Sequence, residues 1–319
     1  MSSASARAHA NIALVKYWGK RDEALFLPTN GSLSLTLDGL YTTTTVTYGD
    51  GAADRLVLDG VEQGGDALAK VSRFLDRVRP DGLRAFVESE NHVPTAAGLA
   101  SSASAFAALA VAASRAAGLA LTPDELSRLA RQGSGSACRS IYGGFVEWRR
   151  GERADGADSH GVPIAPQAHW DVRMLVAVLV KAPKAVSSRE GMRRTVQTSP
   201  FYPGWLASVD SDLAAARAAI ATRDLDALGT VMEASALKMH ATMLAAQPPF
   251  TYLRPASLAA IQAVWDARAA GLNGYLTMDA GPNVKVLCAA ADAPAWQACL
   301  AALPDVVEVL CCGPGPGVA

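Results

Sequence analysis

The sequence has 319 residues, half of them hydrophobic, and its formal net charge at pH 7 is −1. This balance excludes the strongly cationic surface that nucleic-acid-binding proteins usually carry, and the length suggests two domains or one large one, at roughly 150 residues per domain. The most apolar run, residues 103–121, is interrupted by Arg115 and several serines, so we expect no transmembrane segment.

The cysteines and histidines also argue against several classes of protein. None of the five cysteines forms a C-x-x-C pair, and the five histidines are scattered along the chain. We therefore expect neither a disulfide framework nor a zinc site, and we predict a cytoplasmic location because that compartment keeps thiols reduced. The N-terminal stretch lacks the apolar core of a signal peptide.

The first half of the chain is predicted to be rich in strands. Asp59-Gly60 is typical of a tight hairpin turn between two of them. An apolar repeat over residues 66–78 has the spacing of a helix. The expected strands cover 12–17, 33–37, 41–48, 55–58, 83–88 and 141–148.

Two loops of small residues lie in the middle of the chain. The first, residues 93–104, leads into an alanine-rich helix that ends near Gly118. Thr122 and Pro123 predict the start of the next helix, which runs to about residue 132. The second loop covers residues 133–140.

The second half is predicted to be mostly helical around a few apolar strands. Residues 151–169 are polar and predict a long loop at a domain boundary, and we expect the glycine- and proline-rich tail 313–317 to be frayed. Because strands and helices interleave without strict βαβ alternation, the fold class is α+β. The expected strands are 172–180, 274–278, 284–288 and 306–311, and the expected helices are 188–196, 205–222, 225–246, 257–270 and 294–303.

The first small-residue loop has the design of an anion site. Glycine and alanine let a ligand approach the backbone, and the first N–H groups of the helix that follows carry positive partial charge. It is not a Walker A loop, because it lacks the G-K-[ST] ending. On these residues alone, a simple helix cap has about even odds.

Other polar groups fit the same kind of ligand. Arg139 adjoins the second loop and can grip a carboxylate or phosphate, although a surface arginine on a turn is the plainer alternative. Lys16 and Lys20 flank two aromatic residues after a strand, and Asp279 lies in a turn where it could orient a hydroxyl or merely cap its own backbone. Together these residues indicate phosphoryl transfer between two polyanions.

Several motifs, read in order, carry a close family resemblance. Residues 93–104 (VPTAAGLASSAS) resemble the phosphate-binding motif of the GHMP kinase superfamily. Within it, 11–21 (NIALVKYWGKR), 134–140 (SGSACRS) and 278–283 (MDAGPN) resemble the signatures of the diphosphomevalonate decarboxylase family, as do 239–242 (MHAT) and 248–252 (PPFTY).

This resemblance implies a reaction and a fold. Members convert mevalonate 5-diphosphate and ATP into isopentenyl diphosphate, ADP, phosphate and CO₂, by phosphorylation of the 3-hydroxyl followed by loss of that phosphate and of CO₂. The implied GHMP kinase fold has an N-terminal domain like the second domain of ribosomal protein S5, here residues 1–170, and a ferredoxin-like C-terminal domain, residues 171–319. The active site would lie in the cleft between them, and members are commonly homodimers.

The resemblance also implies roles for individual residues. Asp279 would orient or deprotonate the 3-hydroxyl, Lys16 would neutralise charge near it, and Arg139 would hold the substrate carboxylate. The implied substrate-binding residues are Tyr17, Trp18, Gly19, Lys20, Ser134, Gly135, Ser136, Ala137, Cys138, Arg139, Ser188, Arg189 and Met192. ATP with Mg²⁺ would contact Lys70, Ser89, Asn91, Gly98, Leu99, Ala100, Ser101, Ser102 and Ser104, with Ser102 as the metal ligand.

Three alternatives stay open at this point. A sister enzyme could act on mevalonate 5-phosphate, and a mevalonate 3-kinase would stop before decarboxylation. A non-catalytic binding protein could keep the same fold. The presence of Asp279, Lys16 and Arg139 argues against the last two.

Overall fold

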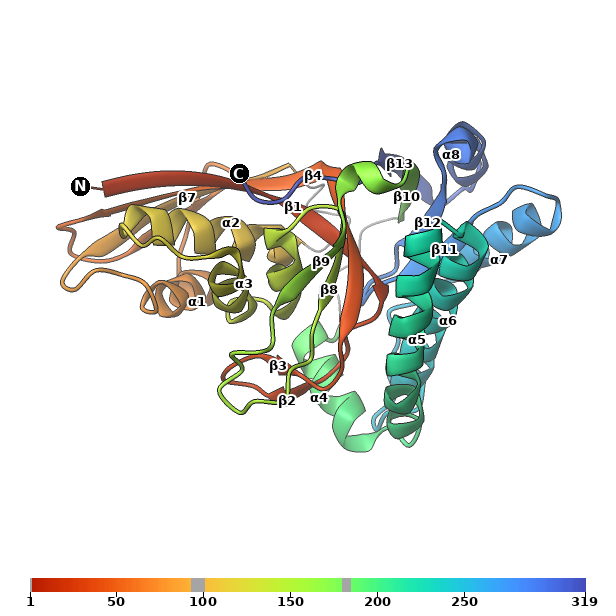
Figure 1. Ribbon diagram of the computed structural model, residues 1–319, viewed down its shortest axis with the longest axis horizontal. Coiled ribbons are helices and arrows are strands. Elements are labelled where there is room, and N and C mark those ends of the chain that lie inside the picture. Colours follow the sequence, from red (N-terminus) through yellow and green to blue (C-terminus); the bar gives the residue numbers. More distant parts are fainter. Residues whose placement is uncertain (1, 93–100, 180–184) are drawn as a thin grey trace.

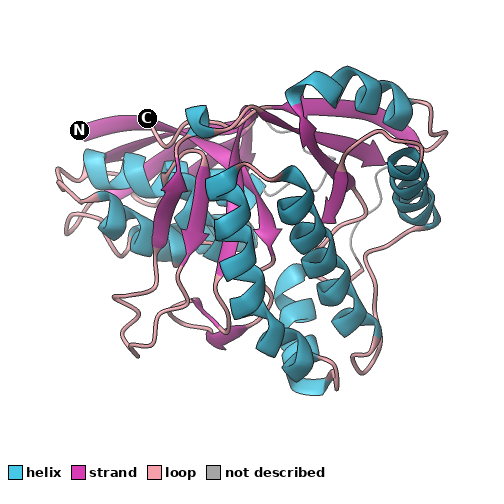
Figure 2. Ribbon diagram, turned by 45° about the vertical axis from the view of Figure 1, so that its right-hand side comes forward, coloured by secondary structure: helices cyan, strands magenta, loops and turns pink. Residues whose placement is uncertain are grey.

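The structure, a computed structural model, describes residues 2–92, 101–179 and 185–319. It is an α+β fold in which one large sheet and one smaller sheet each carry helices (Figures 1 and 2). No helix within these ranges is both long and apolar enough to cross a membrane.

The larger sheet is built around one long strand. This strand, β4 (Ser32–Gly49), pairs with three others, so that the two strands expected over 33–37 and 41–48 are one. Its threonine run alternates between buried and partly exposed positions, as a strand packed on one face requires. The other strands are β1 (Ser2–Val15), β5 (Arg55–Leu58), β6 (Val61–Gln63), β7 (Arg84–His92), β8 (Phe145–Trp148) and β9 (Gly161–Ala165), while β2 (Lys20–Asp22) and β3 (Leu27–Pro28) form a separate hairpin.

Helices cover this sheet and end near the centre of the molecule. Buried alanines of α2 (Ser101–Ala116) let that helix pack closely against β1 and β4. Thr122 caps α3 (Pro123–Arg131) as expected, in a reciprocal pair with Glu125. The set is completed by α1 (Gly65–Leu75) and the 3₁₀ helix η1 (Gly135–Ile141).

The smaller sheet has helices on both faces. Its strands are antiparallel in the order β11 (Tyr275–Met278), β12 (Val284–Ala289), β10 (Val172–Leu179) and β13 (Val306–Cys312). One face packs on α7 (Pro255–Ala269) and α8 (Ala293–Ala301), and the other on α5 (Tyr202–Thr222) and α6 (Leu225–Leu244). The short elements are α4 (Ser188–Thr198), η2 (Gln167–His169) and η3 (Ala290–Asp292).

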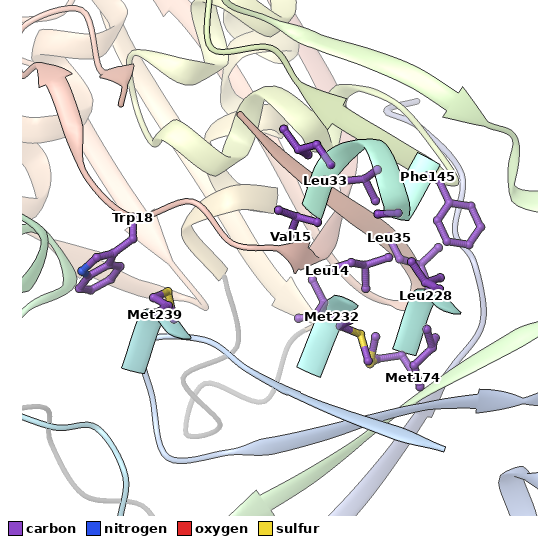
Figure 3. Close-up of a cluster of buried hydrophobic side chains, with 14 of the residues drawn as sticks. Leu14, Val15, Trp18, Leu33, Leu35, Phe145, Met174, Leu228, Met232 and Met239 are labelled. Carbon is purple, nitrogen blue, oxygen red and sulfur yellow. The ribbon is translucent and has the colours of Figure 1, made fainter. Parts of the chain in front are cut away.

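A single hydrophobic cluster joins the two halves. Leu14 and Leu35 of the larger sheet lie in it with Met174 of the smaller sheet and with Leu228 and Met232 of α6, all fully buried (Figure 3). Because this apolar surface is shared, each half holds the other in place.

Two expectations about irregular segments are wrong. Residues 151–169 are not one long loop, because β9 pairs with β8 inside them. The tail 313–317 is not frayed: the N–H of Gly313 donates to Asp38 Oδ1, and the N–H of Gly315 donates to the carbonyl of Thr36. Glycine permits this approach, since a Cβ on Gly315 would lie 2.4 Å from the carbonyl carbon of Leu37.

Candidate active site

A cavity of about 410 Å³ lies where elements of both halves meet. Its walls come from the segment after β1, from η1, from the start of α2 and from α4, α6 and the turn after β11. The predicted residues that line it are Lys16, Tyr17, Trp18, Lys20, Lys70, Ser102, Ser134, Gly135, Ser136, Arg139, Ser188, Arg189, Met192 and Asp279.

Asp279 sits between two buried lysines. Lys16 Nζ lies 2.8 Å from Oδ1 of the carboxylate, and Lys285 Nζ lies 2.9 Å from Oδ2. Burial alone would raise the pKa of Asp279, but the two lysines outweigh it and hold that pKa far below its usual range. Asp279 is therefore ionised at neutral pH and can accept a hydrogen bond from a ligand hydroxyl. It is not merely a residue that caps its own turn.

Lys16 is held rigidly at the wall of the cavity. Its Nζ donates a second hydrogen bond to the carbonyl of Ala13, and its backbone N–H donates to Ser235 Oγ on α6. Burial lowers the pKa of Lys16 to about 8, against the attraction of Asp279 and with the repulsion of Lys285. A lysine with this pKa changes charge close to physiological pH.

Arg139 presents a buried guanidinium to the same cavity. Its Nε donates to Asn11 Oδ1 at 3.1 Å and its Nη1 to Ser32 Oγ at 2.6 Å. Asn11 is fixed in turn, because its Nδ2 donates to the carbonyl of Ser136 and to Ser140 Oγ. Within the described residues no carboxylate pairs with Arg139, so its charge is available to an anionic ligand.

A second group of cations, Lys20, Lys70 and Arg189, also lines the cavity. Lys20 Nζ and the Arg189 guanidinium approach the ring of Phe26, at 4.4 and 5.5 Å from its centroid. Lys70 Nζ lies over the Phe106 ring. Burial lowers the pKa of Lys70, and repulsion by Arg189 and Lys20 adds to the shift. Lys20 Nζ also pairs with Glu23 Oε2 at 2.6 Å, so Arg189 and Lys70 contribute most of the positive charge that suits a ligand with several negative charges.

Two aromatic residues add buried polar atoms. Among the described residues, neither Tyr17 Oη nor Trp18 Nε1 has a hydrogen-bond partner, although both atoms are buried. Both residues line the cavity, and a buried group without a partner is costly. These two atoms therefore indicate hydrogen bonds that a ligand would complete.

The predicted nucleotide residues are only partly gathered here. The Ser102 hydroxyl lies 3.2 Å from Ser134 Oγ at the start of α2, beside the cavity. Ser104, Ser89 and Asn91 lie outside its lining and bond to Thr42, Thr44 and again Thr42 of β4. Gly98, Leu99 and Ala100 lie outside the described residues, as does the side chain of Ser101. The nucleotide contacts of these residues stay predictions.

Three predicted substrate-binding residues, Gly19, Ala137 and Cys138, are not part of the cavity lining. Gly19 has a φ of 112°, which glycine adopts readily, and a Cβ there would collide with Tyr202 Oη. Ala137 and Cys138 are fully buried in η1. Their expected role as direct contacts has no support in the described lining of the cavity.

Sequence reasoning did not select some residues that the structure brings to this site. Lys285 is the most notable, since a lysine inside an apolar strand is a signal of a buried charge. His240, within the motif 239–242, is buried near Lys16 and Asp279. The unselected residues that line the cavity are Asn11, Ala13, Phe26, Gly133, Met239 and Ala280.

The donor set also fits a magnesium ion held largely by phosphate. Within the described residues, no group of three or more histidine, cysteine or acidic side chains is arranged to hold a metal. Mg²⁺ commonly takes only one or two protein ligands and completes its shell with water and substrate phosphates. The Ser102 hydroxyl, beside a cavity lined with cations, meets that requirement.

Two family models cover most of the chain. The diphosphomevalonate decarboxylase-like N-terminal domain matches residues 8–161, and the mevalonate 5-diphosphate decarboxylase C-terminal domain matches residues 174–308. The chain belongs to the diphosphomevalonate decarboxylase family. The family resemblance noted in the sequence and the GHMP kinase fold it implied are confirmed.

Individual relatives agree with this family assignment. Diphosphomevalonate decarboxylase of Ganoderma lucidum is 41% identical over 309 residues, which are 89% of this chain and 77% of the relative. The human protein of the same name is 40% identical over 309 residues, 90% and 76% of the two chains.

Solved structures of the family superpose closely. Mevalonate diphosphate decarboxylase from Staphylococcus aureus has a TM-score of 0.95 at 46% identity, covering 100% of this chain and 97% of that chain. MDDEF in complex with MVAPP, AMPPCP and magnesium has a TM-score of 0.93 at 48% identity, covering 100% and 98%.

Proposed function

We propose that the cavity binds mevalonate 5-diphosphate, with the carboxylate on Arg139 and the 3-hydroxyl on Asp279. The chain is a diphosphomevalonate decarboxylase, an ATP-dependent lyase of the mevalonate pathway that forms isopentenyl diphosphate and CO₂. The observation that carries the residue roles is the carboxylate of Asp279, held by Lys16 in a cavity that Arg139 also lines.

Asp279 orients the hydroxyl and does not act as a strong base. A carboxylate beside two ammonium groups accepts a hydrogen bond but has little affinity for a proton. The neighbouring ammonium of Lys16 also offsets the negative charge that develops on the hydroxyl oxygen as that oxygen bonds to phosphorus and its proton passes to an oxygen of the transferred phosphoryl group. Positioning and charge stabilisation are the main contributions expected in phosphoryl transfer.

Arg139 holds the carboxylate that leaves as CO₂. Its guanidinium has a charge that no described acidic side chain neutralises, and Asn11 and Ser32 fix its direction. A substrate carboxylate would restore the missing counter-charge. This contact orients the carboxylate relative to C3 before that carbon becomes electron-poor.

The diphosphate lies at the opposite side, on Lys20 and Arg189. Tyr17 Oη, whose hydrogen-bonding capacity is unused within the described residues, donates to it. The serines of the two lining segments, Ser134, Ser136 and Ser188, complete this set, and Trp18 and Met192 pack against the mevalonyl carbons.

ATP and Mg²⁺ are the cofactors of this enzyme. ATP supplies the phosphoryl group, and Mg²⁺ neutralises phosphate charge. On this chain we assign Ser102 and Lys70 to the nucleotide phosphates, with Ser102 as the metal ligand. Ser102 stands in the first turn of α2, where the free N–H groups of a helix carry positive partial charge.

We also infer the domain division, the assembly and the location. Residues 1–170 form the N-terminal domain and 171–319 the C-terminal domain, supported by the separation of the two sheets between β9 and β10. The protein is a homodimer, by its likeness to the family. Its location is the cytoplasm, which agrees with five unpaired cysteines. Light scattering on the purified protein tests the dimer.

A coupled assay of ADP release, with CO₂ measured in parallel, tests the proposed function. Equal concentrations of mevalonate 5-diphosphate and mevalonate 5-phosphate are compared in the presence of ATP and Mg²⁺. We expect ADP and CO₂ in equal amounts from the diphosphate and little turnover of the monophosphate. A strong preference for the monophosphate would contradict the assignment of the diphosphate site.

A substitution at Asp279 tests the residue roles directly. Asp279→Asn keeps the shape but removes the charge, and we expect CO₂ release to fall by about 10²-fold or more, since loss of the group that orients the attacking hydroxyl costs about that much. Substrate binding, followed by calorimetry, should largely survive. Near-native turnover would remove Asp279 from the mechanism.

A further inference from the structure

Lys285 occupies an unusual place for a charged residue. It lies within the apolar strand β12, opposite Thr277 of β11 and Val176 of β10, and its side chain is 3% exposed. Its neighbours Val284 and Val286 belong to the cluster under α7 and α8. Because side chains alternate along a strand, Lys285 points to the other face, toward the active site.

Lys285 contacts the Asp279 oxygen that Lys16 does not contact, and it does so from outside the cavity lining. Its Nζ lies 2.9 Å from Oδ2, and that oxygen is buried although the whole side chain is 29% exposed. Lys16, which contacts Oδ1, lines the cavity, whereas Lys285 is absent from the described lining. The two lysines therefore hold opposite sides of one carboxylate, one beside the ligand and one away from it.

We propose that Lys285 is a positioning residue for the decarboxylation reaction, which fixes the Asp279 carboxylate from the side opposite the substrate. This inference rests on the proposed function of the cavity. A carboxylate held by Lys16 alone could rotate about its χ angles, whereas two ion pairs from different elements restrict it to one orientation.

Lys285 also sets the electrostatic balance around Lys16. The charged groups near Lys16 are Asp279 on the turn after β11, Lys285 on β12 and Arg139 on η1. His240 of α6 also faces them, and burial lowers its pKa to about 4, so it is neutral in the assay range. Removal of the Lys285 charge leaves one fewer cation to repel the Lys16 ammonium. The pKa of Lys16 should then rise from about 8.

The test compares Lys285→Met and Lys285→Arg with the wild type in the coupled assay between pH 6 and 10. Methionine keeps the length of the side chain and suits a buried site, but removes the charge. We expect kcat of Lys285→Met to fall by about 10- to 100-fold, as for a catalytic group displaced by about 1 Å, with little change in KM. The alkaline limb of kcat/KM should move to higher pH.

Lys285→Arg restores a cation and should recover part of kcat and the position of the alkaline limb. Lys238→Met is the matched control, because it removes a partly buried lysine–carboxylate pair, between Lys238 of α6 and Asp212 of α5, that lies outside the cavity lining. Native kcat in Lys285→Met would overturn the proposal. So would lost activity with an unmoved limb and no recovery in Lys285→Arg, since that describes a purely structural residue.

Two further outcomes are distinguishable. If circular dichroism shows that Lys285→Met does not fold, Lys285→Gln, which removes the charge but keeps a polar side chain, takes its place: a reduced kcat with a raised alkaline limb supports the proposal, and a native kcat overturns it. If the wild type itself releases no CO₂, the proposed function fails and this inference fails with it. A wild type that is active while Lys285→Met is equally active overturns only the role of Lys285.

Discussion

Arg139 shows how a buried cation can be kept ready for a ligand. Burial lowers the pKa of its guanidinium, and its described hydrogen-bond acceptors are the neutral oxygens of Asn11 and Ser32. Neutral acceptors fix the direction of the group without cancelling its charge. The free protein therefore bears the cost of desolvating the guanidinium, and part of that cost is recovered when an anion binds.

We expect Arg139→Met to weaken both substrate binding and turnover. Loss of one partner of a buried charge pair costs about 2–5 kcal/mol, which corresponds to roughly 30- to 5,000-fold in kcat/KM. Initial rates over a range of mevalonate 5-diphosphate concentrations measure this. Arg115→Met, at an exposed arginine of α2, is the control. Unchanged kinetics in Arg139→Met would exclude the carboxylate contact.

His240 links the active site to stability in acid. Burial lowers its pKa to about 4 from an ordinary 6.5. Between these two values the unfolded chain binds more protons at this position than the folded chain, so the free energy of unfolding falls as the pH falls through this window. The change amounts to about 3 kcal/mol, at 1.36 kcal/mol per unit.

Substitution of His240 should therefore flatten the acid dependence of stability. We measure the free energy of unfolding in urea at pH 6.5 and at pH 4. In His240→Gln the decrease between these two pH values should be smaller than in the wild type by most of this amount, whatever the variant's stability at neutral pH. His92→Gln, at an exposed histidine, measures the effect of losing an imidazole elsewhere. Equal slopes in the wild type and His240→Gln would contradict the role of burial.

At the scale of elements, the tail 313–319 supports the helix that carries Arg139. The N–H of Val318 donates to the carbonyl of Ile141, the last residue of η1, and the N–H of Gly144 donates to the carbonyl of Gly315. The chain packs backbone against backbone here. Side chains larger than hydrogen are excluded at the tightest points.

We expect Gly315→Ala to destabilise the fold by about 1–3 kcal/mol, because its Cβ would overlap the backbone of Leu37 and Asp38. Urea unfolding monitored by tryptophan fluorescence measures this. Gly204→Ala on α5, where a Cβ meets no atom within 4 Å, is the control and should be neutral or slightly stabilising. Equal midpoints in the two variants would mean that the tail is not packed as described.

Local patterns predicted the regular elements but not the edge pairings. The helix cap at Thr122 and the Asp59-Gly60 turn depend on adjacent residues, so sequence alone could locate them. Strand β9 contains Pro163, which favours a loop, yet proline is tolerated in this strand because it lies at the sheet edge. The pairing of the tail depends on residues far away in sequence, such as Thr36, and no local pattern encodes it.

The same distinction holds for the active site. Lys16 and Asp279 lie within the motifs 11–21 and 278–283, and the family resemblance of those motifs was enough to predict that both residues belong to one active site. Lys285 lies six residues beyond Asp279 in the sequence. That spacing does not reveal that the antiparallel pairing of β11 and β12 places the Lys285 ammonium against the Asp279 carboxylate. Its contact could be seen only once the strand register was known.

At the scale of the whole molecule, one of the hydrophobic clusters is shared by the two halves, while each half also has a cluster of its own. Leu14, Leu35 and Phe145 pack with Met174 and Met232 in a cluster that joins the larger sheet to the smaller one (Figure 3). Neither half can be removed without exposing a large apolar surface of the other. Stability should therefore belong to the whole chain.

We expect a single cooperative unfolding transition in calorimetry, with equal calorimetric and van't Hoff enthalpies. Leu14→Ala in the first half and Met232→Ala in the second should each cost about 2–5 kcal/mol and lower the midpoint of the same transition. Two separate transitions, with each variant moving only one of them, would show that the halves unfold independently.

The tail also has a consequence for the order in which the chain matures. The N–H and carbonyl of Arg7, on β1, pair with the carbonyl and N–H of Ala319 (Figure 1). During synthesis, Arg7 leaves the ribosome long before Ala319, and an unpaired strand edge is a template for aggregation. This part of β1 therefore lacks that pairing in the nascent chain until Ala319 has left the ribosome. We expect the nascent chain to aggregate, or to bind a chaperone, most readily during that interval.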